Sequence, residues 1–411
     1  MYSLYSFYFS RLGQCYTYDM YIALLGRQPA LSIAELERTY SRVSWFSADV
    51  ALVDTDHIDV QKLGGTQKAG KVAFEVSVSD WRKVSDAIVA HYSRKWNGYD
   101  GKITLGLSVY GMDVPVRDLQ KAGLILKGKL KKNGTSIRLI PNQEKALSSA
   151  TSHHNKLGLS DNKVELLIVK GGKSIIVAES SGAQNITALA ARDQGRPKRD
   201  AFVGMLPPKL AQIMINLAGE ITKDAESDLS SPRILDPFCG TGVLLQEASL
   251  LGYAVYGTDL AEKMIRFSRD NLNWLESNYH LSTQWYLHEG DAVETKWQQP
   301  IDAVVSESYL GQPFSAPPSS SKLTEVKGNC NHIISGFLKN LHGQLKPGTP
   351  VVLAVPAWKD KEGRFTHLPL IDTIEDLGFS QVQFETVPTE QLLYHRPDQV
   401  VARELLVLTR I

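Results

Sequence analysis

The sequence predicts an α/β protein with two lobes, and three observations support this prediction. Short apolar runs alternate with amphipathic stretches along both halves of the chain. A strand–turn–helix signature at residues 233–248 opens the second half, and a polar, basic segment at residues 183–204 separates the halves. We therefore expect an N-terminal α/β half over residues 20–182, a linker over 183–204, and a sheet domain over 205–411.

The composition is that of an ordinary globular protein. The 411 residues suffice for two or three domains, with 43% hydrophobic and 22% charged residues. The formal net charge is +1, so any nucleic-acid-binding surface must be local. Cys15, Cys239 and Cys330 form no disulfide framework or zinc-binding spacing, which favours a reducing, cytoplasmic compartment. No apolar run is long enough to predict a transmembrane helix.

The first nineteen residues differ from the rest. They are rich in aromatic residues and lack the basic start and aliphatic core of a signal peptide. A clean strand pattern begins at Met20. Two interpretations stay open: residues 1–19 form a disordered extension, or Met20 is the working start of the protein.

Periodicity predicts the elements of the N-terminal half. Two β-runs flank Gly171-Gly172, which is a hairpin signal. The expected helices cover residues 29–37 and 85–95, and the expected strands cover 50–53, 103–110, 164–169 and 173–179. His153 and His154 are adjacent, and no third ligand is spaced to complete a metal site, so we expect no metal.

Residues 117–145 carry the clearest charge asymmetry, with eight basic residues against two acidic ones. The apolar residues 124–126 are expected to supply packing. The basic side chains predict either a phosphate-binding face or an ordinary solvated face, and charge alone does not decide between them. The candidate RNA contacts are Arg117, Lys127, Lys129, Lys131, Lys132 and Arg138.

The second half opens with Asp236-Pro-Phe-Cys-Gly-Thr-Gly242, between an apolar strand and a helix. Gly240 and Gly242 permit positive φ and a close approach of the backbone to a ligand, and the helix N-terminus presents free N–H groups. A second strand ends at Asp259, where a carboxylate suits a ribose diol. Asp291 follows a third strand and is placed to reach an adenine edge.

Three interpretations compete for these residues. A dinucleotide site would carry Gly-x-Gly-x-x-Gly, which is absent after Gly240, and the acid at Asp236 would repel a pyrophosphate. A zwitterionic amino-acid group can be held there, which favours S-adenosylmethionine (SAM) and a methyltransferase. The remaining interpretation is a plain α/β turn, which the ordered series of three acids disfavours.

The remaining elements follow from the same patterns. The pattern predicts a helix from Leu210, packed on the sheet and covering the cleft, and a loop over the site at residues 313–321. The other expected elements are strands at 301–306, 351–355, 382–385 and 404–408 and helices at 323–344 and 367–377, the last ending at Gly378.

Three motifs carry a family resemblance: the residues from Asp236 to Gly242 with Asp259 and Asp291, the run 192–211, and Tyr394-His-Arg-Pro-Asp398. The chain resembles the tRNA guanine-10 N2-methyltransferase family, strongly in the second half and more weakly in the first. The resemblance implies a class I (Rossmann-like) methyltransferase sheet, a THUMP-containing RNA-binding half, SAM as cofactor, tRNA as partner, and in one branch a small activating subunit.

The sequence departs from amino-directed methyltransferases at Ser306-Glu-Ser-Tyr-Leu310, where these enzymes carry Asp/Asn-Pro-Pro-Tyr/Phe. In one register Tyr309 keeps the aromatic place and Ser306 takes the place of the acid. In the other, Glu307 takes the place of the acid and Tyr309 sits one position early. Ordinary roles remain open for both: a surface acid for Glu307 and packing for Tyr309.

We expect Asp236, Gly240 and Gly242 to line the methionine part of SAM, Asp259 the ribose and Asp291 the adenine. Glu307 would accept from the guanine amine and Tyr309 would stack on the base. Besides this enzyme, two alternatives remain: an RNA-binding relative with weak or lost transfer, and an RNA methyltransferase with a different target nucleotide.

Overall fold

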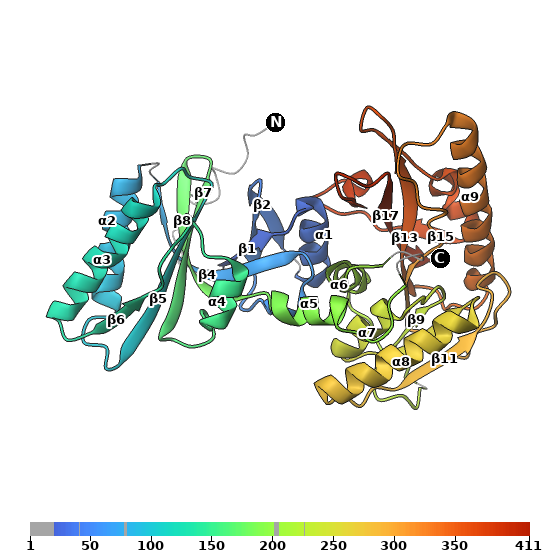
Figure 1. Ribbon diagram of the computed structural model, residues 1–411, viewed down its shortest axis with the longest axis horizontal. Coiled ribbons are helices and arrows are strands. Elements are labelled where there is room, and N and C mark those ends of the chain that lie inside the picture. Colours follow the sequence, from blue (N-terminus) through green and yellow to red (C-terminus); the bar gives the residue numbers. More distant parts are fainter. Residues whose placement is uncertain (1–19, 41, 78–79, 201–204, 226) are drawn as a thin grey trace.

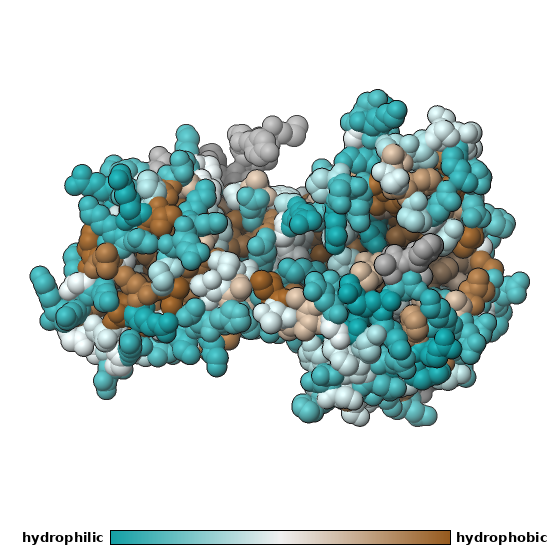
Figure 2. Space-filling view, in the orientation of Figure 1, coloured by the Kyte–Doolittle hydropathy of each residue, from teal (hydrophilic) through white to brown (hydrophobic). Residues whose placement is uncertain are grey.

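The computed structural model of the protein describes residues 20–411 except 41, 78–79, 201–204 and 226. It has two lobes, each built on one β-sheet, so the predicted α/β class is confirmed (Figure 1). Both expectations for residues 1–19 lie outside the described residues. Figure 2 shows hydrophilic and hydrophobic residues interleaved on the visible face of the first lobe and a more uniformly hydrophilic surface on the lower part of the second.

The first sheet has eight strands in the order β2-β3-β1-β4-β8-β7-β5-β6. The long strand β4 pairs with β1 on one side and β8 on the other, so it joins two parts of the sheet. The predicted hairpin is confirmed, since β7 and β8 pair antiparallel around a turn in which Gly172 has φ of 56°. The strands are β1 (Met20–Leu25), β2 (Val43–Ser47), β3 (Val50–Asp54), β4 (Thr66–Val76), β5 (Lys102–Tyr110), β6 (Ser136–Leu139), β7 (Lys163–Gly171) and β8 (Ser174–Ala183).

Two helices pack on the outer part of this sheet, α2 (Trp81–Lys95) and α3 (Val116–Lys132). Leu119, Leu126 and Leu130 lie on one stripe of α3 and are buried against β5 and β7. The short helix α4 (Ser149–His154) lies near β8. Figure 1 places α3 at the end of the first lobe that is farther from the second lobe.

The second sheet runs β11-β10-β9-β12-β13-β17-β15, with β14 paired to β13 and β16 to β17. The strands from β11 to β13 are mutually parallel, and β17 is antiparallel to β13. The carboxyl ends of parallel strands meet at one edge, so the residues that end β9, β10 and β12 lie together. The strands are β9 (Arg233–Asp236), β10 (Ala254–Asp259), β11 (Trp285–Glu289), β12 (Ala303–Glu307), β13 (Pro350–Lys359), β14 (Phe365–Thr366), β15 (Phe379–Gln381), β16 (Leu393–Tyr394) and β17 (Val401–Arg410).

Helices cover both faces of the second sheet. On one face lie α6 (Pro208–Leu217), α7 (Val243–Leu250) and α8 (Glu262–Tyr279), which share a core with alternate residues of β12, β13 and β17. On the other face lies α9 (Ser320–His342), whose Ile334, Phe337 and Leu338 are fully buried.

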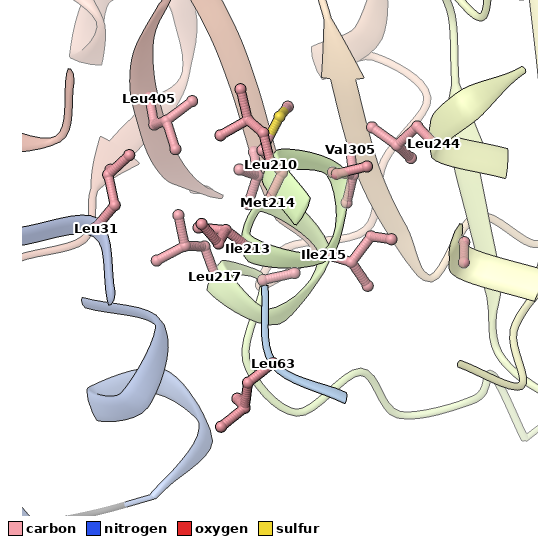
Figure 3. Packing of buried hydrophobic residues seen from close by; sticks show 14 of the residues in the cluster. Leu31, Leu63, Leu210, Ile213, Met214, Ile215, Leu217, Leu244, Val305 and Leu405 are labelled. Carbon is pink, nitrogen blue, oxygen red and sulfur yellow. The ribbon is translucent and has the colours of Figure 1, made fainter. Parts of the chain in front are cut away.

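Helix α6 packs against both lobes (Figure 3). Leu210, Ile213, Met214 and Leu217 are buried in one continuous core. That core includes residues of α1 (Pro29–Thr39) in the first lobe and of β12 and β17 in the second. The predicted helix from Leu210 is therefore confirmed, and it holds the lobes together.

Three sequence expectations differ from the structure. Residues 367–377 form two 3-10 helices, η3 (Pro369–Thr373) and η4 (Glu375–Leu377), rather than one α-helix. Leu368 is extended because it precedes Pro369, so no helix begins at His367, and Asn331 Oδ1 accepts from the free first-turn N–H of Leu370. The expected cap is correct, since Gly378 has φ of 86°.

The other two differences involve contacts between segments distant in sequence. The strand expected at 382–385 is instead Phe379–Gln381, because Glu37 of the first lobe accepts from the backbone N–H groups of Glu385 and Thr386. Within residues 183–204, the segment Ile186–Gln194 forms the helix α5, whose Arg192 is held by Glu247 of α7.

Glu35 of α1 forms a polar contact inside the lobe junction. Its carboxylate accepts from the backbone N–H of Gly64 at 2.8 Å, from that of Gly65 at 2.7 Å and from Asn216 Nδ2 of α6 at 2.7 Å. Burial raises the pKa of Glu35 to about 7, against the opposing effect of these donors.

We predict that Glu35→Ala destabilises the junction by about 3 kcal/mol, because three buried donors lose their acceptor. Urea unfolding monitored by tryptophan fluorescence measures the change. Glu220→Ala, at an exposed position just after α6, is the control and should leave the midpoint unchanged. Equal midpoints for the two variants would show that Glu35 does not stabilise the junction.

Candidate active site

The turn between β9 and α7 has the geometry of a ligand cradle. Gly240 and Gly242 have φ of 52° and 79°, in the left-handed region that favours glycine. Gly242 immediately precedes α7, whose N-terminal N–H groups therefore face the end of the sheet. A Cβ atom added to Gly242 would lie 2.9 Å from Ser268 Oγ, so a side chain does not fit there.

Two residues of α8 hold this turn, and the sequence gave no sign of either. Ser268 Oγ donates to the carbonyl oxygen of Gly240 at 2.8 Å. Asn271 Nδ2 donates to the carbonyl oxygen of Thr241 at 2.8 Å and to that of Lys198 at 2.9 Å. The helix thus fixes the glycine turn and the segment before α6 at once.

Asp259 and Asp291 occupy adjacent strand ends. Asp259 Oδ2 accepts from the backbone N–H of Gly240 and Oδ1 from that of Ala261. Gly290 N–H donates to the carbonyl oxygen of Asp259 at 3.0 Å, which brings the third acidic segment next to the second. The exposed Asp291 carboxylate accepts from the backbone N–H of Val293.

Asp236 is almost fully buried at the end of β9. Its Oδ1 accepts from Ser306 Oγ at 2.6 Å and from the backbone N–H of Phe238 at 3.2 Å. Burial is the main cause that raises the pKa of Asp236 to about 7; the nearby charges of Asp259 and Glu307 contribute less, and the two hydrogen bonds oppose the rise. The carboxyl groups of Asp236, Asp259 and Glu307 therefore lie near one another, and a ligand with a cationic centre would stabilise their ionised forms.

The last two residues of β12, Ser306 and Glu307, have different partners. Ser306 is fully buried and bonded to Asp236. The carboxylate of Glu307 forms an ion pair with Arg403 of β17, which donates through Nε. Tyr309 follows with 41% exposure. The structure thus brings Glu307, Tyr309 and the cradle to one edge of the sheet, and Arg403 is a site residue that the sequence did not reveal.

The basic residues of the first lobe lie elsewhere. Arg117 and the lysines of α3 are exposed, as is Arg138 of β6. Leu126 packs as expected, but Leu124 and Ile125 are 60% and 45% exposed, because they lie on the outer side of α3. The structure therefore places this basic face away from Glu307, on the far part of the first lobe (Figure 1).

A cleft of about 1190 Å³ lies between the lobes. The first lobe contributes Arg27, Gly64 and Lys68, and the second contributes Lys209 and Arg396. Burial lowers the pKa of Lys209, which stands in the first turn of α6. The cleft joins the two lobes and reaches the Tyr394–Asp398 segment.

Two searches of the described residues bear on other functions. No group of three or more His, Cys, Asp and Glu side chains in this part of the chain is arranged to hold a metal ion. None of the helices in the described ranges has the length and apolar character that a bilayer crossing requires.

Comparisons with known proteins agree with this geometry. Residues 196–354 match the family described as "RMKL-like, methyltransferase domain". The chain is 31% identical over 172 residues to the tRNA (guanine(10)-N2)-dimethyltransferase of Methanothermobacter thermautotrophicus, covering 41% of this chain and 45% of that protein. It is 31% identical over 121 residues to the tRNA (guanine(10)-N2)-dimethyltransferase of Pyrococcus abyssi, and this alignment covers 29% of this chain and 32% of that protein.

The aligned part is thus less than half the length of these curated relatives. Among solved structures, TrmN from Thermus thermophilus aligns with 95% of this chain and 100% of its own, at 15% identity and a TM-score of 0.49. Residues 196–354 are similar to this methyltransferase-domain family, and the predicted resemblance is confirmed over that part of the chain.

S-adenosyl-L-methionine is the methyl donor of this class, and the residues present fit it. The turn admits a close ligand at Gly240, where the nearest atom to an added Cβ is the carbonyl oxygen of Phe238 at 4.0 Å, while Gly242 lets the turn pack against Ser268. Asp259 is in place to accept from ribose hydroxyls, and the acidic cradle at Asp236 suits a positively charged group.

We predict that Gly242→Ala weakens SAM binding at least about tenfold, because the new methyl group meets Ser268 and the backbone is strained. Isothermal titration measures the affinity. Gly252→Ala is the matched control, since Gly252 has φ of 94° but open space around it. Wild-type affinity in Gly242→Ala would refute the assignment of this turn to the cofactor.

Asp236 predicts a pH dependence of stability. The pKa of Asp236 is about 7 in the folded protein and near 3.8 in the unfolded protein. Between pH 3.8 and about 7, the folded state therefore keeps a proton on this carboxyl group that the unfolded state has released. The wild type should therefore lose stability relative to Asp236→Asn as the pH rises from about 4 to about 7. The asparagine can keep both hydrogen bonds, because both are made by Oδ1.

Urea unfolding of both proteins at several pH values measures this difference. A constant difference between pH 4 and 7 would show that the carboxyl group titrates normally in the fold.

Proposed function

We propose that the protein transfers a methyl group from SAM to the exocyclic N2 of a guanosine in tRNA. The observation that supports this most is the Glu307 carboxylate, which stands beside the cradle of Asp236 and Gly240 on a methyltransferase domain. The relatives that match this domain are named tRNA (guanine(10)-N2)-dimethyltransferase, so position 10 is our proposed target.

The chemistry requires activation of a weak nucleophile. The lone pair of the guanine amine is delocalised into the ring, so the site must accept a hydrogen bond from this amine and orient it. SAM, when bound, supplies the methyl group as an electrophile on its sulfonium. Glu307 Oε1 is engaged by Arg403, and the other carboxylate oxygen is the proposed acceptor for the N2 proton.

The remaining site residues position the reactants. Tyr309 is exposed at the end of β12 and can stack on a base. Ser306 donates its hydroxyl hydrogen to Asp236. This favours Glu307, rather than Ser306, as the residue that corresponds to the acid of the Asp/Asn-Pro-Pro-Tyr/Phe motif. N2 gains the methyl group and loses a proton toward the carboxylate of Glu307.

We propose that the first lobe is the THUMP-containing RNA-binding half and that α3 contacts tRNA phosphates. In support, Lys127, Lys129, Lys131 and Lys132 are all exposed on one helix. The net charge of the whole chain is only +1, so the excess of positive charge on α3 distinguishes this helix from the rest of the protein. We also propose residues 20–182, 183–204 and 205–411 as the functional divisions of the chain.

We further propose tRNA as the partner and the cytoplasm as the place of action, since the reducing environment inferred from the cysteines fits both. A small activating subunit remains a prediction from the resemblance. Adding candidate subunits to the methylation assay tests it, and an unchanged rate in their presence would contradict it.

We predict that the wild type, incubated with SAM and unmodified tRNA transcript, yields N2-methylguanosine on nucleoside mass spectrometry. Glu307→Gln should slow the transfer by roughly 100-fold, because an amide accepts less strongly than a carboxylate at the developing positive charge. Glu325→Gln, exposed on α9, is the control.

If Glu307→Gln forms N2-methylguanosine at the wild-type rate, Glu307 has no catalytic role. A different methylated nucleoside would favour the alternative target. Binding of SAM and tRNA without any product would favour the RNA-binding relative.

We predict that substituting Lys127, Lys129, Lys131 and Lys132 together by alanine weakens tRNA binding and flattens its salt dependence. Each lost phosphate contact reduces the slope of log K against log salt by roughly 0.7 to 0.9. Fluorescence anisotropy at several salt concentrations measures both. Substituting Lys322 and Lys327 of α9 is the control, and equal slopes for the two variants would exclude α3 from the interface.

A further inference from the structure

A small pocket of about 270 Å³ adjoins Glu307 through Arg403. Its walls come from segments far apart in the sequence. They include Asp193 of α5, Pro207 before α6, and Tyr394, Arg396, Gln399 and Arg403 from the C-terminal part. Apart from Arg403, which pairs with Glu307, none of these residues has yet received a role in the transfer reaction.

Strand pairing explains how the wall is built. Tyr394 of β16 lies directly opposite Arg403 of β17 in an antiparallel register, so their side chains share one face of the sheet. Arg403 aligns with Pro356 of β13, whose neighbour β12 ends at Glu307. Glu307 aligns with Ala354, two residues before Pro356, so its side chain lies diagonally from Arg403 on the same face of the sheet.

The polar groups of this wall are not all satisfied by the protein. Gln399 Oε1 is buried and has no hydrogen-bond partner among the described residues. Within the same part of the chain, Arg403 makes its one side-chain hydrogen bond through Nε, to Glu307. Buried acceptors without a partner are rare in folded proteins, and the residue that carries this one lines the pocket.

These groups match the edge of a guanine. Guanine presents N–H donors at N1 and N2 and acceptors at O6 and N7. Gln399 Oε1 and Glu307 can accept from the donors, the terminal nitrogens of Arg403 can donate to the acceptors, and Tyr394 offers a stacking surface. A base that reacts must leave its stack and be read in this way.

We propose that this pocket receives the target guanine, with Tyr394 and Gln399 as base-binding residues and Arg403 as a positioning residue that aims Glu307. The inference rests on the proposed function and names the substrate subsite within it. The pocket shares Asp193, Pro207, Tyr394 and Arg396 with the large cleft, so the flanking nucleotides have a continuous path toward the first lobe.

The test of the pocket uses the full-length protein under single-turnover conditions with saturating SAM. Tyr394→Ala and Gln399→Leu should each slow methylation at least about tenfold, because the loss of one stacking or hydrogen-bonding contact with the base has an effect of this size. The Kd for tRNA should stay within about twofold, because phosphate contacts dominate affinity. Tyr286→Ala, at a 43% exposed position on β11, is the matched control.

The role of Arg403 is tested by a double-mutant cycle with Glu307. Arg403→Met should slow transfer about tenfold in the wild-type background and add no further loss to Glu307→Ala, because it acts through that carboxylate. Arg403→Lys should recover part of the rate. SAM titration verifies folding of each variant, and the lysine variant carries the test if the methionine variant fails to bind SAM.

The outcomes separate the two proposals. If the wild type forms no N2-methylguanosine, the proposed function fails and the pocket assignment fails with it. If the wild type is active but Tyr394→Ala and Gln399→Leu react at its rate, only the pocket assignment is overturned. Independent, additive losses from Arg403 and Glu307 would overturn the positioning role of Arg403.

Discussion

The apolar packing around α6 is the interaction on which the rest of the structure depends. This helix buries side chains on nearly every side, against α1 of the first lobe and against β12 and β17 of the second. Arg38 of the first lobe adds hydrogen bonds to the carbonyl oxygens of Leu217 and Ala218 at its C-terminal end. Since burial of apolar surface is the main favourable term in folding, the lobes form one body around the helix.

The position of α6 also shapes the functional surfaces. Its N-terminal end, at Pro207 to Lys209, forms a wall of the cleft, and Pro207 also lines the small pocket. The other wall is the Tyr394–Asp398 segment, which Gln28 of the first lobe ties down through the carbonyl oxygen of His395. The cleft, which shares residues with the small pocket at Arg403, is therefore made by the same contacts that join the lobes.

Local patterns in the sequence predicted the strand ends and the glycine turn proposed to hold the cofactor, because Asp236, Gly240, Gly242 and Asp259 belong to elements that neighbouring residues define. The sequence could not reveal Arg403. Its contact with Glu307 spans 96 residues and arises only when β17 returns antiparallel beside β13.

Similar reasons explain two of the other differences. Arg192 looked like part of a free basic linker, but it is buried against Glu247, because α5 packs beside α6 and α7. The error at residues 367–377 is local, since Leu368 precedes Pro369 and is extended. The strand error at 382–385 follows from Glu37 of the first lobe, which binds backbone donors of Glu385 and Thr386. Such contacts leave no periodicity in the sequence.

The most direct test of this account is an experimental structure of the full-length protein with S-adenosylhomocysteine and tRNA. The account predicts the ribose at Asp259 and one guanine turned out of its stack, with N2 facing Glu307. It also predicts that the RNA contacts both lobes across the cleft. A target base bound away from Glu307, or a cofactor product bound away from the glycine turn, would contradict it.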